Sequence, residues 1–333
     1  MSDAPWFEDF AVGDDFSEVP AITLTDGHAA VHQAIFGDRL RLPLDRELSQ
    51  KVTGMKQAMV NPSLVCNMAI GQTTIPSQRV MGNLFYRGLV FKQPVFVGDT
   101  LTTTTKVVGL KQNKPKPGRA ASGMVALEIH VQNQQGETVL LFWRCPMIPC
   151  RDPEAKTGHS DSFDVMPESL EIGALKSAVP SWDLVTFRTS NADHHYDNLP
   201  LGQLLLVEAR DTVTLAPELV RLTMNMAMTH TDATRSVYGK RLVYGGHTIS
   251  IAAAQLARIF PNMVTIIGWY HCDHVAPVFE QDIVRTQVTI VEKHSLAEGG
   301  IVDLHVEAFV LRDPSDTTVE TKVLDWKMAA LFA

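Results

Sequence analysis

Apolar and polar residues alternate with a period of two along two widely separated stretches of the chain. Residues 125–132 and 302–310 carry Val, Leu, Ile or Ala at every second position, with mostly polar residues between them. Because successive side chains of a strand point to opposite faces, both stretches predict half-buried strands. Long β-prone runs precede them at 100–110 and 283–292, and a further strand is expected around 208–214.

Two other segments are apolar on nearly every side. They are residues 64–70 and residues 249–260, the second ending at Pro261. A helix without a polar face must be buried on most sides. One enclosed helix followed by long antiparallel strands is the hot-dog arrangement, in which a curved sheet wraps a central helix. Two such units usually pair edge to edge, so a fused tandem would be a dimer within one chain.

The chain also contains an internal repeat, which is the first feature to look for in a long sequence. Four pairs of segments match in the same order. They are residues 7–9 with Gly13 and 196–198 with Gly202, residues 94–96 with Asp99 and 277–279 with Asp282, residues 127–131 and 302–306, and Trp143-Arg144 and Trp326-Lys327. Loops of different length between the copies explain why the spacing between partners varies.

This repeat predicts the domain organisation. The first unit is expected at 1–150 and the second at 192–333. Residues 151–191, rich in Pro, Ser and charged residues, read as a linker. The predicted fold is therefore of the α+β class, a tandem or double hot-dog with two antiparallel sheets that each wrap a central helix.

Charge and composition exclude several classes of protein. The 333 residues are 45% apolar and 20% charged, which is typical of a globular chain, and the net charge of −8 argues against nucleic-acid binding. No stretch approaches the ~20 apolar residues that span a membrane, and the N-terminus does not resemble a signal peptide. We therefore expect a cytoplasmic protein without nucleic-acid or membrane partners.

The cysteines agree with a reducing compartment. Cys66, Cys145, Cys150 and Cys272 form neither a CxxC pair nor a zinc pattern. We expect all four to be free thiols in the core.

The second unit holds a set of residues suited to catalysis. Asn225 lies five residues before His230, and Gly245-Gly246-His247-Thr248 follows fifteen residues later, at the start of the buried helix. A histidine can take a proton from water near neutral pH. Two glycines let the backbone approach a ligand closely, at a helix N-terminus whose N–H groups have no internal partner.

This pattern resembles the MaoC-like, or (R)-specific enoyl-CoA hydratase, family. Its motif is Asp-x4-His followed by a Gly/His turn that opens the central helix, and here Asn225 stands at the Asp position. Within the family, residues 241–247 and 94–113 are most similar to mesaconyl-CoA (β-methylmalyl-CoA) hydratases. The resemblance implies a hydratase/dehydratase that adds water to a 2-enoyl-CoA thioester. It implies no cofactor, because CoA arrives as part of the substrate.

The resemblance also implies roles for these residues. His230 would act as the base, and Asn225 would hold the water, since an amide neither gives nor takes a proton at pH 7. Residues Gly245, Gly246, His247 and Thr248 would bind the substrate and form an oxyanion hole, because negative charge develops on the thioester oxygen. Asp232 is a candidate for the missing acid–base partner.

Other interpretations remain open at this point. Asn225 could simply tie a loop, and the two glycines could form a tight helix entry without a ligand. The protein could be a non-catalytic acyl-thioester-binding protein that has lost the motif Asp. A thioesterase is a weaker alternative, because that reaction needs a group that activates water for attack at the carbonyl.

The first unit looks degenerate as a catalytic unit. Pro43 lies five residues after Asp38, where a histidine would be needed, and Pro62-Ser63-Leu64 stands where the second unit has Gly-Gly-His. We therefore expect one site per chain, with the first unit shaping the substrate tunnel. Pairing of chains into a homodimer stays open.

A metal site is not expected. The pair His194-His195 stands beside Asp193 and Asp197, but adjacent histidines rarely converge on one ion and no third ligand is visible.

Overall fold

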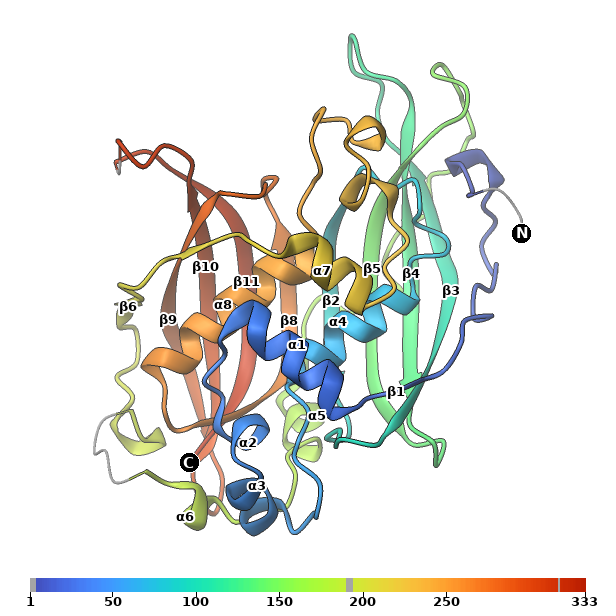
Figure 1. Ribbon diagram of the computed structural model, residues 1–333. Coiled ribbons are helices and arrows are strands. Elements are labelled where there is room, and N and C mark those ends of the chain that lie inside the picture. The colour runs from blue at the N-terminus through green and yellow to red at the C-terminus, as the bar shows by residue number, and fades with distance from the viewer. Residues whose placement is uncertain (1–3, 190–193, 317) are drawn as a thin grey trace.

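Each half of the chain forms four long antiparallel strands and one central helix (Figure 1). The computed structural model describes residues 4–189, 194–316 and 318–333. The first half contributes α4 (Pro62–Gln72), β2 (Gly82–Phe91), β3 (Thr100–Gln112), β4 (Ser122–Gln132) and β5 (Thr138–Pro149). The second half contributes α8 (Gly245–Ile259), β8 (Met263–His274), β9 (Ile283–Ser295), β10 (Gly300–Leu311) and β11 (Glu320–Phe332).

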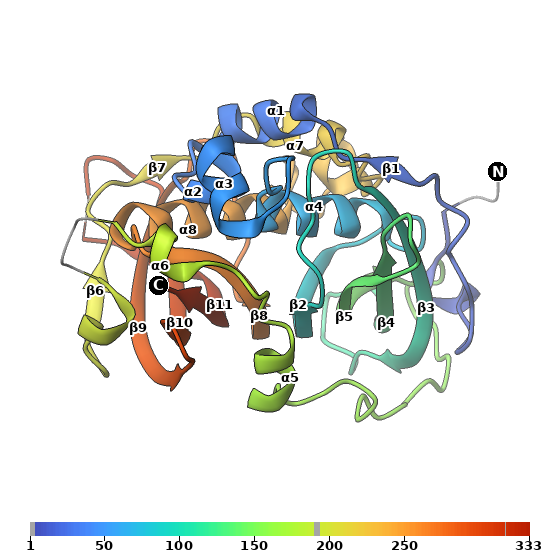
Figure 2. The same ribbon diagram turned by 90° about the horizontal axis from the view of Figure 1, so that it is seen from below.

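The two halves share a single sheet. Three short strands complete it, β1 (Ile22–Thr23), β6 (Leu204–Leu206) and β7 (Asp211–Thr212). The strand order is β1-β3-β4-β5-β2-β8-β11-β10-β9-β6, with β7 also paired to β9. At the centre β2 and β8 run antiparallel, with Tyr86 opposite Cys272 and Leu89 opposite Trp269. The predicted edge-to-edge pairing is confirmed, and the two expected sheets are joined into one. Figure 2 shows helices α1 (Asp26–Phe36), α4, α7 (Ala216–Leu222) and α8 on one side of this sheet and α5 (Ile172–Ser177) on the other.

The prediction of a strand at 208–214 is largely wrong. Only β6 (Leu204–Leu206) and β7 (Asp211–Thr212) pair with β9, at the outer edge of the sheet. The polar residues between and beside these two short strands do not belong to the sheet. Both carboxylate oxygens of Asp211 turn inward to α8, where Arg258 and Gln255 bind them at 2.8 and 2.7 Å. Short edge strands of this kind also limit pairing with other chains.

The central helices begin and pack as their sequences require. All residues of α4 are buried, and the side chain of Asn61 caps its N-terminus by accepting from the N–H of Ser63 at 2.8 Å. Residues 246–257 of α8 are buried as well. The two helices meet, and Nδ2 of Asn67 donates to Oγ of Ser250 at 2.8 Å. The buried helices predicted from the apolar segments are confirmed.

Two of the repeat matches fall on corresponding features. Residues 7–9 and 196–198 each form a short 3-10 helix. The carboxylates of Asp99 and Asp282 accept from the N–H groups three residues before them, at 2.7 and 3.0 Å. The same turn therefore precedes β3 and β9 in both halves.

The match between the two tryptophan–basic dipeptides is one residue out of register. Arg144 lies opposite Tyr86 of β2, whereas Met328 lies opposite Trp269, the residue of β8 that corresponds to Tyr86. Arg144 therefore corresponds to Met328. A one-residue slip moves a side chain to the other face of a sheet, so Trp143 does not share the inward position of its supposed partner. The match between residues 127–131 of β4 and residues 302–306 of β10 is also displaced, by two residues. A displacement of two leaves each side chain on the same face of the sheet.

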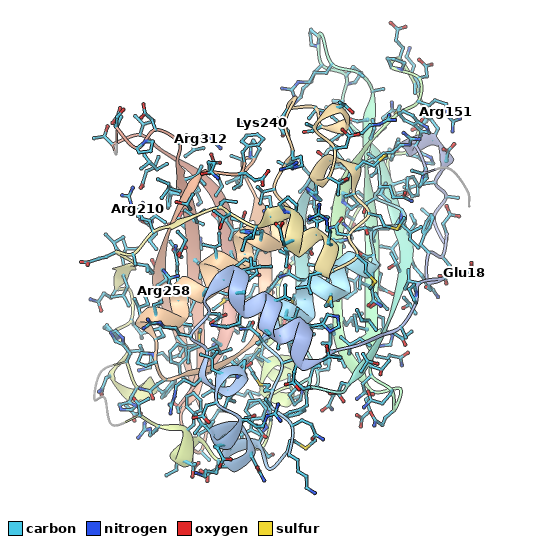
Figure 3. The ribbon with its side chains drawn as sticks, viewed as in Figure 1. Glu18, Arg151, Arg210, Lys240, Arg258 and Arg312 are labelled. Atoms are coloured by element: carbon cyan, nitrogen blue, oxygen red, sulfur yellow. The ribbon has the colours of Figure 1, made fainter. Side chains whose placement is uncertain are left out.

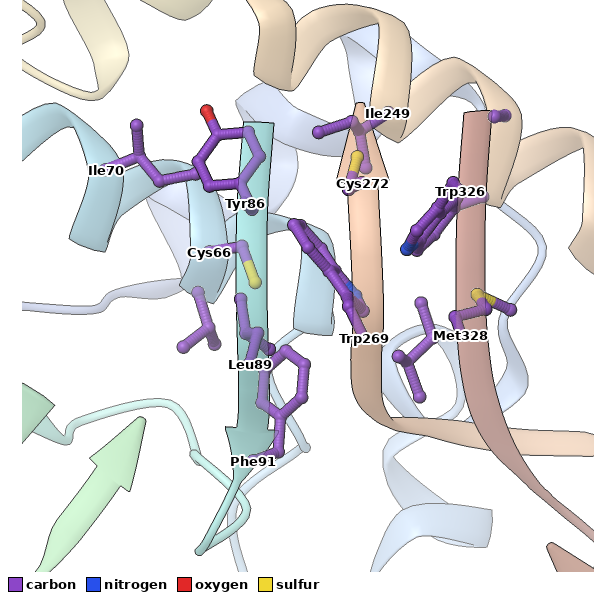
Figure 4. Packing of buried hydrophobic residues seen from close by; sticks show 14 of the residues in the cluster. Cys66, Ile70, Tyr86, Leu89, Phe91, Ile249, Trp269, Cys272, Trp326 and Met328 are labelled. Carbon is purple, nitrogen blue, oxygen red and sulfur yellow. The ribbon is translucent and has the colours of Figure 1, made fainter. Parts of the chain in front are cut away.

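One hydrophobic core spans the junction of the halves (Figure 4). Trp269 packs edge-on against Tyr86, with ring centroids 5.8 Å apart, and against Trp326 at 5.3 Å. Because these rings come from β2, β8 and β11, neither half has a separate core. The four cysteines are buried free thiols, as predicted.

The segment between the halves lies against the folded body. It forms α5 (Ile172–Ser177) and α6 (Leu184–Phe187), which bury Leu175 and Phe187. The boundary expected between linker and second unit falls on residues 190–193, outside the described part. Within the described residues, no helix is long and apolar enough to cross a membrane.

Candidate active site

A cavity of about 930 Å³, including its open mouth, lies between the two halves at the N-terminus of α8. The first half lines it with Tyr86, Arg144 and residues 80–84, and the second half with His230, residues 242–245 and residues 274–278. Tyr238 and Val275 at its rim are exposed. Figure 3 shows Lys240 and Arg312 on the surface at this end of the molecule.

His230 is held with one ring nitrogen anchored and the other available. It ends a 3-10 turn (Met228–His230), and its Nδ1 lies 2.7 Å from the carbonyl oxygen of Leu242. A carbonyl only accepts, so Nδ1 carries the proton and Nε2 keeps its lone pair. Nε2 has no hydrogen-bond partner in the described part of the chain, and the ring lines the cavity.

The surroundings keep His230 neutral. Burial lowers its pKa to about 4, the positive charge of Arg144 acts in the same direction, and the Leu242 carbonyl opposes them. At neutral pH the ring is therefore an unprotonated base that faces the cavity.

Asn225 lines the same cavity and also orders its own loop. Its Oδ1 accepts from the N–H of Ala227 at 2.9 Å. This bond fixes the amide, and none of the described residues accepts a hydrogen bond from its Nδ2. Asn225 can therefore tie the loop and donate to a ligand at once.

The turn at the start of α8 is not simply open to a ligand, because side chains of the protein occupy the space beside both of its glycines. Gly245 and Thr248 line the cavity, and no side chain caps the helix. A Cβ on Gly246 would collide with Oδ1 of Asn67, and a Cβ on Gly245 would collide with Nε2 of His274. Each glycine thus makes room for a particular side chain.

His247 and Asp232 lie away from the cavity. The Nε2 of His247 donates to the carbonyl of Thr214 at 2.9 Å, and its ring packs against Phe36. Two residues along a helix correspond to about 200° of rotation, so this side chain points away from the face of Gly245. Asp232 is exposed and accepts from the N–H of Thr234 at 2.9 Å.

His274 is a cavity residue that the motif analysis missed. It is the last residue of β8, and its Nε2 is buried without a partner among the described residues. Burial lowers its pKa to about 4, nearby Asp273 opposes the shift, and His230 adds to it. The repeat offers the signal that could have found it. His274 stands three residues before Pro277, where the first half has Phe91 three residues before Pro94.

Arg144 is a second residue that the motif analysis missed. It is only 3% exposed, and NH2 donates to the Thr73 carbonyl at 2.8 Å and to Oγ of Ser77 at 2.7 Å. Its Nε is buried and unpartnered, and no carboxylate of residues 4–189, 194–316 or 318–333 forms an ion pair with it. The helix C-terminus at Thr73 offsets part of this charge. An uncompensated buried cation is costly and favours an anionic ligand.

No Asp or Glu of the described residues lines this cavity. The described side chains that could exchange a proton there are those of two histidines and three tyrosines, namely His230, His274, Tyr86, Tyr238 and Tyr244. In the first half, Asp38 is instead a buried structural residue, with Oδ2 accepting from Asn61 and Oδ1 from the N–H of Leu40, both at 2.8 Å. Burial raises the pKa of this carboxyl.

A smaller cavity of about 360 Å³ occupies the corresponding place in the first half. Pro62, Phe91 and Pro94 line it, at the positions that match Gly245, His274 and Pro277. Ala178, Pro180 and Trp182 of the linker form another part of its wall. The first half therefore lacks both the polar groups and the space of the larger cavity.

Other polar clusters lie outside the cavity. Asp193 is not among the described residues, and Asp197 pairs with Arg188 at 2.9 Å. Two groups of described side chains have metal-like spacing, and these are Glu292, His294 and Asp303, and His305, Glu307 and Asp325. In the second group Lys322 already binds both carboxylates, at 2.5 and 2.6 Å.

Comparisons with known proteins agree with this fold. No family model matches the chain. It is 28% identical to the mesaconyl-CoA hydratase of Cereibacter sphaeroides over 94% of this chain and 91% of that protein. It is 29% identical to the beta-methylmalyl-CoA dehydratase of Chloroflexus aurantiacus over 87% of this chain and 83% of that protein.

Solved structures give the same result. RV0216 from Mycobacterium tuberculosis, described as a conserved hypothetical protein with a double hotdog fold, matches at a TM-score of 0.90 and 42% identity over 98% of both chains. A structure described as a MaoC domain protein dehydratase from Chloroflexus aurantiacus matches at 0.87 and 26% identity, over 100% of this chain and 98% of that one. The fold and the cavity define a double hot-dog protein. The chain belongs with the double hot-dog proteins, and it is similar to MaoC-like members of that group.

Proposed function

We propose that this protein is an acyl-CoA hydratase/dehydratase, which adds water to the double bond of a 2-enoyl-CoA thioester and removes it in the reverse direction. The observation that carries the proposal is the free Nε2 of His230, which lines the cavity at the uncapped N-terminus of α8. Named relatives that are hydratases and dehydratases of CoA esters support it.

The chemistry follows from these groups. Nε2 of His230 takes a proton from water while the hydroxide oxygen bonds to Cβ of the enoyl group. Asn225 donates from Nδ2 to this water and holds it. The electron pair of the double bond moves to the thioester oxygen, where N–H groups of the first turn of α8 stabilise the charge. The proton on His230 then passes to Cα, and the base is restored.

The buried cation of Arg144 restricts which acyl group the cavity would favour. Arg144 lines the cavity without a carboxylate partner, so an acyl group that brings its own negative charge would complete the site. Mesaconyl-CoA, the substrate in the name of three relatives, carries a free carboxylate. We propose a carboxylated 2-enoyl-CoA in preference to an uncharged one.

A substrate screen tests both proposals. The full chain is assayed with crotonyl-, mesaconyl- and longer 2-enoyl-CoA esters, following loss of the enoyl absorbance and uptake of deuterium at Cα from D₂O. We expect turnover, with mesaconyl-CoA preferred to crotonyl-CoA by roughly tenfold or more. Binding without turnover would favour the acyl-thioester-binding protein, and release of free CoA would favour a thioesterase.

Arg144→Met provides the matched variant for the substrate preference, because the second half has Met328 at this position. It should remove the preference for the carboxylated ester and leave crotonyl-CoA turnover within a few-fold. Equal losses on both esters would mean that Arg144 acts only on the structure.

A further inference from the structure

We propose that His274 is a catalytic residue which, as a neutral imidazole, donates a hydrogen bond from its Nε2–H to the thioester oxygen of the substrate. The inference rests on the proposed function, and it assigns to a side chain a role that the motif gives to the backbone of the helix turn. His230 remains the base, so the two histidines have different tasks.

The position of the ring carries this inference. Nε2 of His274 lies directly against the first residue of α8, since a Cβ on Gly245 would collide with it. It therefore lies at the helix end whose N–H groups are suited to a developing negative charge. The ring packs edge-on against Tyr86, with centroids 5.9 Å apart, and it lines the same cavity as His230.

The hydrogen bonding of His274 leaves its Nε2 available to a ligand. No described residue forms a hydrogen bond with its Nε2, although that atom is buried. A buried polar atom without a partner is costly, and a ligand that accepts from it recovers this cost. A side chain that only filled space would not need the nitrogen, and the first half indeed has Phe91 at this position.

The protonation state fits a neutral donor. Burial lowers the pKa of His274 to about 4, with His230 adding to the shift and Asp273 opposing it. Asp273 is itself bound by Arg87 at 2.5 Å, which limits its influence on the ring. A neutral imidazole beside a helix N-terminus is a known means of polarising a carbonyl group.

Two variants test the role by kinetics. His274→Phe introduces the residue of the first half and removes the donor, while His274→Gln retains an N–H group. We expect His274→Phe to lower kcat by about 10²–10³-fold, the usual effect of losing one oxyanion donor, with KM within about fivefold. His274→Gln should recover at least tenfold of that loss. The control is His271→Phe on the same strand, whose ring binds Asp325 outside the cavity.

A spectroscopic measurement separates this role from a structural one. The carbonyl stretch of bound cinnamoyl-CoA should move to lower frequency in the parent and in His271→Phe, and the shift should be lost in His274→Phe. Unchanged kcat in His274→Phe, or an unchanged carbonyl shift, would overturn the inference. Equal loss of CoA-ester affinity and kcat would do the same. If the parent hydrates no ester, the proposed function fails, while the carbonyl shift still decides the role of His274.

Discussion

His230 and Asn225 line the same cavity, but they differ in what they can do with a proton. The ring of His230 has a free Nε2 and a pKa lowered to about 4 by burial, so it is a base at neutral pH. The amide of Asn225 can only donate or accept hydrogen bonds. The spacing of these two residues was readable from the sequence. Arg144 was not, because strand pairing brings it to the cavity from a distant segment, and His274 was readable only through the repeat, as the counterpart of Phe91.

This difference predicts a graded set of variants. His230→Ala should lower the rate of hydration by roughly 10²-fold or more, since it removes the base. Asn225→Ala should cost less. Asn225→Asp should be tolerated or faster, because one carboxylate oxygen can keep the bond to Ala227 and the other faces the cavity. Steady-state rates on one enoyl-CoA ester measure all three. The control is His130→Ala, whose ring binds Thr138 away from the cavity, and full activity of His230→Ala would refute the assignment.

At the scale of secondary-structure elements, the start of α8 shows what the sequence pattern predicts and what it does not. The apolar segments predicted both central helices, and the Gly-Gly pair predicted a close approach at the start of α8. The sequence could not show what approaches, because Asn67 comes from α4 and His274 from the end of β8. Only the antiparallel pairing of β2 with β8 and the packing of α4 on α8 bring these side chains to the glycines.

The two glycines should therefore respond differently to alanine. Gly246→Ala collides with Asn67, whose side chain binds Ser250 across the helix pair, so it should lower the free energy of unfolding by about 1–3 kcal/mol. Gly245→Ala displaces His274 and should lower kcat more than stability. Urea unfolding and steady-state kinetics separate the effects. Gly173→Ala in α5, where a Cβ would contact nothing, is the matched control and should be neutral or slightly stabilising.

For the whole molecule, buried neutral histidines set the response to acid. Burial lowers the pKa of His230, His247 and His274 to about 4 and that of His32 to about 3. Between pH 6.5 and 4 the unfolded chain binds these protons and the folded chain does not. Stability is therefore greatest above pH 6.5 and falls as the pH drops toward 4.

The expected slope approaches about 1.4 kcal/mol per pH unit for each such histidine. Urea unfolding at intervals from pH 7.5 to 4.5 would measure it. His32→Leu should flatten the curve, because it removes one of the contributing rings. The carboxyls with lowered pKa, such as Asp325, change charge below pH 4 and act outside this window. A flat profile between pH 6.5 and 4.5 would contradict the burial of these rings in solution.

The linker wall of the smaller cavity also has a consequence for stoichiometry. A dimer of identical hot-dog units would offer two equivalent sites, whereas here Trp182 and Phe91 narrow one of them. Calorimetric titration with a saturated, unreactive acyl-CoA should therefore give one molecule bound per chain, and a value of two would mean that the smaller cavity opens. With the smaller cavity closed, Phe91 and Pro62 are expected to tolerate substitution without loss of acyl-CoA binding, whereas Arg144 and Tyr86, which line the larger cavity from the first half, are not.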